Sequence, residues 1–137
     1  MIRAICRDMF FLGMKSELAE KADISVADDL LETLKSNADR CVGMAANMIG
    51  VKKCIIAVCV GKGKYEVMFN PKITKASGEY ETTEGCLSLN GERPTKRYRQ
   101  ITVAYQDRLF RNLTKQYEGR TAQIIQHEID HTNGIII

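Results

Sequence analysis

Several features that would assign a protein to a class are missing from this sequence of 137 residues. No apolar run approaches the ~18 residues that a membrane-spanning helix needs, so we expect no membrane partner. The first residues show no charged segment followed by an apolar one, so we expect no signal peptide. Internal repeats and low-complexity tracts are also absent. These absences predict a single domain over residues 1–137.

Disulfide frameworks and strong charge are lacking as well. The sequence has five cysteines, an odd number, and no C-x-x-C pair, which favours a reducing compartment and hence the cytoplasm. The formal net charge of +3 is too small to indicate a nucleic-acid partner. Basic residues do gather between Glu92 and Arg99. They form either a solvated strand face or the rim of a pocket that receives an anionic chain end.

The hydrophobic pattern predicts one helix in the N-terminal part of the sequence and one at its C-terminal end. We expect Ser25 to cap the first helix, because Asp28 three residues later completes a capping-box pattern. Its apolar residues recur at helical spacing: Ala27, Leu30, Leu31 and Leu34. We expect a closing helix from about Gly119 to Asn133–Gly134. The final Gly-Ile-Ile-Ile predicts a short apolar strand or a tucked tail.

Strands dominate the middle of the sequence. Residues 52–60 predict a buried strand, and a turn at 61–64 leads to a returning strand at 65–70 that Pro71 should end. Residues 100–107 predict a third strand, and weaker strands are expected at 77–83 and 112–118. This order predicts an α+β fold with mostly antiparallel sheets.

The closing helix carries a metal-binding pattern. His127, Glu128 and His131 form H-E-x-x-H, and at about 100° per residue the two histidines differ by only ~40° in direction. Ile125 and Ile129 point to roughly the opposite side, so the helix should be buried between layers. Chance spacing is the alternative interpretation, but these are the only two histidines of the sequence.

A catalytic site of this type normally needs a third protein ligand. The metzincin proteases, which also have a glycine at the position of Gly134, use a third histidine where this sequence has Ile137. The third ligand must therefore be a carboxylate or a thiolate. Cys86 is a candidate, because the preceding Gly85 allows close approach of the backbone.

Three stretches together resemble the peptide deformylase family, metalloenzymes that remove the formyl group from new bacterial polypeptides. Residues 84–88 read E-G-C-L-S, and residues 126–134 read Q-H-E-I-D-H-T-N-G. Residues 41–50 match the family's G-x-G-x-A-A-x-Q-x-G except at Cys41 and Met48. The resemblance implies a deformylase-like fold around a central metal-binding helix.

The resemblance also implies a site and a reaction. The metal ligands would be Cys86, His127 and His131, and the ion would be Fe²⁺, with Zn²⁺, Ni²⁺ or Co²⁺ as alternatives. Glu128 would act as general base and then general acid on an N-formyl-methionyl peptide, with the backbone N–H of Leu87 as an oxyanion donor. The substrate pocket would include Gly43, Met44, Met48, Glu84, Gly85 and Ile124. Glu84 would also support a ligand, and Asp130 would either orient a neighbour or remain solvated or salt-bridged.

Met48 is the main departure from the family, because a thioether cannot replace the amide hydrogen that a glutamine donates to the oxyanion. Losing one such donor typically costs about 10²–10³ in rate. Met48 could fill apolar space, it could leave the donor role to Asn47 or a nearby arginine, or its sulfur could approach the metal. Arg93 and Arg97 are weaker candidates for contacts with the peptide. The short C-terminus argues against a helix that docks on the ribosome.

Two functions follow from these observations. The first is removal of the N-formyl group from nascent polypeptides at a reduced rate. The alternative is a deformylase-like metal-binding protein that acts on another acyl amide or has a binding or regulatory role. A zincin-like peptidase fits less well, because the third histidine is absent.

Overall fold

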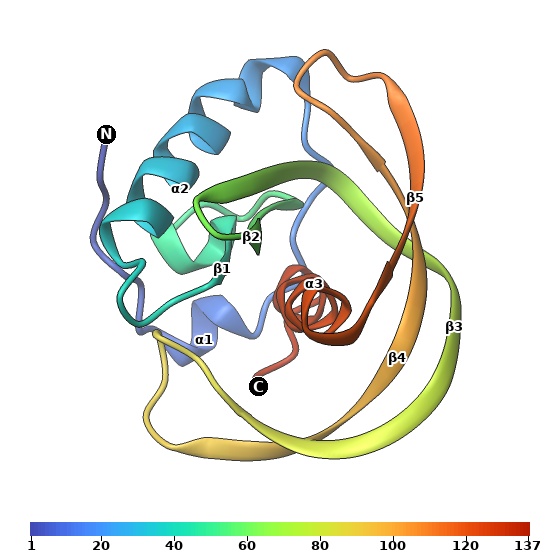
Figure 1. Ribbon diagram of the computed structural model, residues 1–137. Helices are drawn as coiled ribbons and strands as arrows, with labels where there is room; N and C mark the ends of the chain where they lie inside the picture. The colour runs from blue at the N-terminus through green and yellow to red at the C-terminus, as the bar shows by residue number, and fades with distance from the viewer.

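One antiparallel sheet wraps around a central helix in the computed structural model, which describes residues 1–137 (Figure 1). The strands are β1 (Gly43–Ala45), β2 (Ile55–Gly61), β3 (Lys64–Gly85), β4 (Glu92–Gln106) and β5 (Asn112–Glu118). The α-helices are α1 (Met9–Leu12), α2 (Ile24–Ser36) and α3 (Gly119–Thr132), and the 3₁₀ turns are η1 (Lys21–Asp23) and η2 (Ala46–Ile49). The α+β class and the antiparallel sheet are confirmed.

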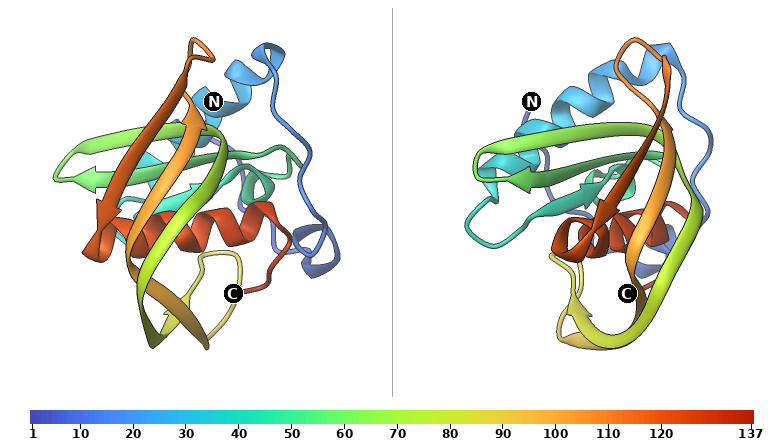
Figure 2. Two further views of the ribbon diagram at one scale, coloured as in Figure 1. Left: turned by 90° about the vertical axis from the view of Figure 1, so that its right-hand side faces the viewer. Right: turned by 45° about the vertical axis from the view of Figure 1, so that its right-hand side comes forward.

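The strands are arranged in the order of the sequence, β1-β2-β3-β4-β5, and every neighbouring pair is antiparallel. The long strands β3 and β4 curve together along one side of α3, and β5 leads directly into that helix (Figure 2). Because β1 lies at the end of this order, one of its backbone edges is not paired within the sheet.

The expectation that Pro71 ends a strand was wrong. β3 continues through Pro71 to Gly85, and the weak strand expected at residues 77–83 is its second half. The pairing with β4 shifts between Phe69 and Lys72, where Asn70 has a φ of 52°. A proline is tolerated at such a bulge because no ladder hydrogen bond needs its missing N–H. The bulge also increases the local twist and bend of the strand.

The capping prediction at Ser25 was also wrong, because α2 begins at Ile24 and Ser25 is its second residue. The preceding turn uses Asp23, whose carboxylate accepts the backbone N–H of Glu20 at 2.8 Å. Three of the four apolar residues expected on the inner face of α2, Ala27, Leu30 and Leu34, are fully buried, whereas Leu31 is only partly buried.

The strands β1 and β2 and the start of β3 separate two parts of the hydrophobic core, and α3 packs in one of them. Ala122, Ile125 and Ile129 of α3 pack against the sheet, together with residues such as Ile56 and Val103. A second cluster joins α2 and η2 to the opposite face of these strands, through residues such as Met44 and Ile55. The prediction that isoleucines bury one side of the closing helix between layers is confirmed.

The C-terminal residues form a tucked tail and not a strand. Ile137 is buried, and Gly134 has a φ of 75° with room for no side chain, since a Cβ there would lie 2.6 Å from the carbonyl oxygen of Gly13. The tail therefore packs against the turn that follows α1. None of the helices combines the length and the apolar character needed to cross a bilayer.

Candidate metal centre

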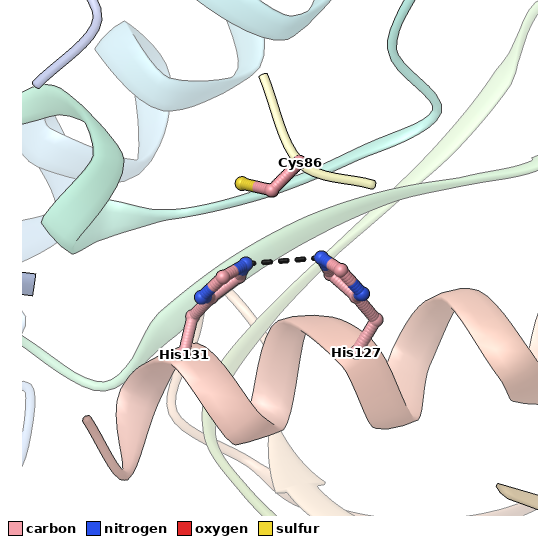
Figure 3. A group of neighbouring side chains, drawn as sticks. All are labelled: Cys86, His127 and His131. Carbon is pink, nitrogen blue, oxygen red and sulfur yellow. Dashed lines mark hydrogen bonds between the residues drawn. The ribbon is translucent and has the colours of Figure 1, made fainter. Parts of the chain in front are cut away.

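Three potential ligands converge between α3 and the loop that follows β3. His127 and His131 lie on successive turns of α3, and Cys86 approaches them from across the gap (Figure 3). The Nε2 atoms of the two histidines are 3.0 Å apart, and the three ligand atoms lie within 4.8 Å of one another. A cysteine and two histidines separated by about 40 residues of sequence thus share one small volume.

The donor set fits a single divalent ion. Bond lengths of about 2.1 Å to nitrogen and 2.3 Å to sulfur place the ligand atoms of a tetrahedral ion about 3.4–3.6 Å apart. The observed separations, 3.0 Å between the two nitrogens and at most 4.8 Å within the group, bracket this range. One thiolate with two imidazoles suits zinc and ferrous iron. Burial lowers the pKa of His131 to about 3, which keeps its imidazole neutral. Burial also lowers the pKa of His127, but hydrogen bonds with Cys86 and Glu84 outweigh burial and raise this pKa to about 10, so a metal ion has to displace a proton from this ring.

Glu84 orients the first histidine. Its carboxylate Oε1 lies 2.7 Å from Nδ1 of His127, which leaves Nε2 of that ring directed at His131 and Cys86. A carboxylate on the far nitrogen fixes both the tautomer and the direction of a metal-binding imidazole. Burial raises the pKa of Glu84, but hydrogen bonds from His127, Arg97 and Gln123 outweigh burial and lower this pKa to about 2.

Arg97 holds Glu84 in turn. Its guanidinium donates to both carboxylate oxygens of Glu84, at 2.7 Å for the shortest bond, and Nη1 lies 2.7 Å from Asp130. Arg97 is 3% exposed and therefore cannot contact a peptide as one of the sequence hypotheses suggested. Arg93 is outside the cavity and donates to the carbonyl of Asn90. Asp130 has the salt-bridged role that the sequence had left open.

Glu128 is a buried acid beside the ligands. Burial raises the pKa of its carboxyl group to about 7, although the charge of His127 acts in the opposite direction. Its Oε1 atom has no hydrogen-bond partner in the protein. A side chain with a pKa near neutrality can both accept and donate a proton.

A cavity of about 270 Å³ opens onto these residues. Seven of the residues proposed from the sequence for substrate or catalysis are in its wall, namely Gly43, Met48, Glu84, Gly85, Leu87, Ile124 and Glu128, together with the candidate ligands Cys86 and His127. Met44 is fully buried in the core and is not part of this wall. His131 lies deeper and is 2% exposed.

Met48 is 1% exposed, and its sulfur lies 3.5 Å from the backbone nitrogen of Ala45. This contact favours the space-filling interpretation of Met48. Asn47 is not a substitute donor, because it is 1% exposed and is not part of the cavity wall, and its Nδ2 donates to the carbonyl of His131 at 2.9 Å. The backbone N–H of Leu87 donates to no other backbone group and remains free.

Sequence reasoning missed several residues of the cavity wall, among them Arg40, Val42, Thr83, Arg120 and Gln123. Two of these could have been found, since Arg120 and Gln123 lie seven and four residues before His127, on the same face of a helix. No comparable signal marks Arg40, which lies outside any helix or strand.

Comparison with known proteins gives consistent results. A family model described as polypeptide deformylase matches residues 11–137. The peptide deformylase of Clostridium beijerinckii is 55% identical over 137 residues, covering 100% of both chains. A solved peptide deformylase structure from Thermus thermophilus is similar with a TM-score of 0.86 at 34% identity, covering 99% of this chain and 83% of that one. A solved peptide deformylase structure from Legionella pneumophila is similar with a TM-score of 0.88 at 33% identity, covering 99% of this chain and 83% of that one.

Proposed function

Because this chain belongs to the peptide deformylase family, we propose that it removes the N-formyl group from the N-terminal methionine of nascent polypeptides. The observation that carries this proposal is the convergence of Cys86, His127 and His131 beside the buried acid Glu128, at the inner end of a cavity. The chain is accordingly a metallohydrolase that acts on a linear amide. The cytoplasm is the proposed compartment, since all five cysteines are free.

Cys86, His127 and His131 would hold one divalent ion, with Fe²⁺ as the proposed metal and Zn²⁺, Ni²⁺ or Co²⁺ as alternatives. When bound, such an ion supplies Lewis acidity that activates water and polarises a carbonyl group. Glu84 and Arg97 would keep the His127 ring in the orientation required for binding.

Glu128 would carry the proton during hydrolysis. Its carboxylate form can accept a proton from the attacking water, and its acid form can return that proton to the leaving amine. The free backbone N–H of Leu87 would stabilise negative charge on the formyl oxygen. The products are formate and a peptide with a free N-terminus.

The substrate would bind as an extended chain. The unpaired edge of β1 borders the cavity through Gly43, and an extended peptide can add to such an edge by backbone hydrogen bonds. The methionine side chain would then enter the cavity, where Val42, Met48 and Ile124 offer apolar contacts. A formylated peptide is the proposed partner, and neither nucleic acid nor membrane is proposed.

We expect the rate to be reduced, because Met48 presents sulfur and not an N–H group at the cavity wall. The typical cost of one missing oxyanion donor is about 10²–10³ in rate. The second candidate function, a metal-binding protein with little deformylase activity that acts on another acyl amide or has a regulatory role, rests on this same residue.

The two candidates are separated by an assay of formate release. Protein loaded with Fe²⁺ without air is incubated with a formyl-methionyl tripeptide and with the matching acetyl-methionyl tripeptide, and the metal content is measured in parallel. Formate release that disappears in Glu128→Ala supports the deformylase. Full metal content with no formate release, or faster release of acetate, supports the second candidate.

A further inference from the structure

The acidic side chains of the cavity wall are buried, whereas its arginines are exposed. The two acids in the wall, Glu84 and Glu128, are 8% and 4% exposed, and Glu84 is ion-paired with Arg97. The two arginines in the wall, Arg40 and Arg120, are both exposed. A ligand that enters from solvent therefore meets cationic side chains first.

These arginines have no acidic partner in the protein. The arginines that form ion pairs are Arg3, Arg97, Arg108 and Arg111. Arg40 makes one side-chain contact, a hydrogen bond of 3.2 Å to the side-chain oxygen of Asn37, and none is found for Arg120. Their acidic neighbours in sequence, Asp39 and Glu118, are not part of the cavity wall.

The two arginines come from different elements, which places them on separate parts of the rim. Arg40 lies three residues before Gly43 on the segment that leads into β1, and Arg120 lies in the first turn of α3. A peptide that extends along β1 toward its N-terminal end would pass Arg40, which is also part of the cavity wall. Its residues after the methionine would therefore run between two cations that nothing in the protein neutralises.

We propose that Arg40 and Arg120 make this site selective for formylated peptides that carry a carboxylate on the residues directly after the methionine. This inference rests on the proposed deformylase function and adds a substrate preference to it. Carboxylates can be bound bidentately by arginine, and a solvated pair of this kind contributes modestly and is screened by salt. We expect a preference of about threefold to tenfold in kcat/KM, mainly through KM.

The test uses three C-terminally amidated peptides, formyl-Met-Glu-Glu, formyl-Met-Gln-Gln and formyl-Met-Lys-Lys. Glutamine matches glutamate in shape, and amidation removes the carboxylate of the chain end. The free-acid form of formyl-Met-Gln-Gln then tests separately whether a chain-end carboxylate is recognised in the same way. We expect kcat/KM in the order Glu, Gln, Lys at low ionic strength, with the differences largely lost at 1 M KCl, where the Debye length is about 3 Å.

Two double variants complete the test. In Arg40→Gln/Arg120→Gln, kcat/KM for the Glu peptide should become equal to kcat/KM for the Gln peptide. The control Lys62→Gln/Lys64→Gln, which removes two exposed charges near the β2–β3 turn, should leave the ratio of the two kcat/KM values unchanged. A ratio near one in the unmodified protein, or a ratio that survives in the arginine variant, overturns the inference while turnover of the Gln peptide still supports the deformylase.

A binding measurement gives an answer that does not depend on turnover. The products Met-Glu-Glu and Met-Gln-Gln, both amidated, are titrated into the metal-loaded protein in a calorimeter. Tighter binding of the Glu product, lost in the arginine variant, supports the inference even if no formate is released. Equal affinities overturn it. Absence of turnover for every peptide overturns only the proposed function.

Discussion

Nη2 of Arg97 lies 2.7 Å from Oε1 of Glu84, and both side chains are almost completely buried. The same Glu84 oxygen lies 2.7 Å from Nδ1 of His127, and Arg97 also reaches Asp130, which is 25% exposed. A continuous set of charged contacts therefore leads from a partly exposed acid to one of the proposed metal ligands.

Arg97→Ala should strongly destabilise the fold, because it leaves the buried carboxylate of Glu84 without its cation. Removing one partner of a buried ion pair typically costs about 3–5 kcal/mol. Urea unfolding of the metal-free protein measures this loss. Lys96→Ala, which removes an exposed ion pair with Glu79 on the same two strands, should cost less than about 1 kcal/mol. Equal losses in the two variants would contradict a structural role for the buried pair.

Glu84→Gln should weaken metal binding as well as destabilise the fold, because Glu84 contacts both His127 and Arg97. An amide keeps the shape of the side chain but loses the charge that orients His127, and changes of this kind typically cost about 10–100-fold in metal affinity. Competition with a chelator measures the affinity. Glu81→Gln, on an exposed position of the same strand, is the control. Unchanged affinity in Glu84→Gln would show that the carboxylate does not support the metal site.

Gly43→Ala should reduce turnover sharply. A Cβ atom at this position would lie 2.7 Å from Cγ2 of Ile124 and 2.8 Å from Oε2 of Glu128, so the proposed proton carrier must move. A displacement of about 1 Å at a reacting group can cost about 100-fold in rate. The comparison is Gly61→Ala, where the nearest atom is 3.8 Å away and little change is expected. An active Gly43→Ala protein with an unaltered fold would argue against the placement of Glu128.

Met48→Gln should raise kcat if stabilisation of the oxyanion limits the rate. The new side chain has a similar length, and its amide can donate the hydrogen bond that the thioether lacks. We expect an increase of up to about 100-fold for the formyl-methionyl tripeptide. Thermal unfolding of the same sample is needed as a control, because Met48 is 1% exposed and an unpaired amide would be costly there. A lower or unchanged kcat in a folded protein would mean that another step limits turnover.

The sequence was most informative where one motif contained a complete local geometry. H-E-x-x-H predicts two imidazoles on one face because helical periodicity fixes their directions, and both rings do point to one volume. The assignment of Cys86 needed the resemblance to a family, because the preceding Gly85 made this cysteine a candidate but left a carboxylate possible as the third ligand. The structure brings this cysteine to the two histidines.

Tertiary contacts explain most of what the sequence could not predict. Pro71 looked like the end of a strand, but a bulge accommodates it and β3 continues along the central helix. Arg97 appeared within a run of exposed basic residues, yet it is buried because Glu84 and Asp130 both pair with it. Met44 was assigned to the pocket with its motif, but its side chain points into the core. In each case the deciding partner lies far away in the sequence.

Absorption spectroscopy of the cobalt-substituted protein tests the proposed metal centre most directly. A thiolate ligand gives a sulfur-to-cobalt charge-transfer band, so titration of the metal-free protein with Co²⁺ reports both the stoichiometry and the presence of the Cys86–metal bond. We predict one ion per chain with this band, loss of the band in Cys86→Ser, and its retention in Cys59→Ser, whose thiol lies on β2. A band that persists in Cys86→Ser, or a protein that binds no cobalt, would contradict the metal centre described above.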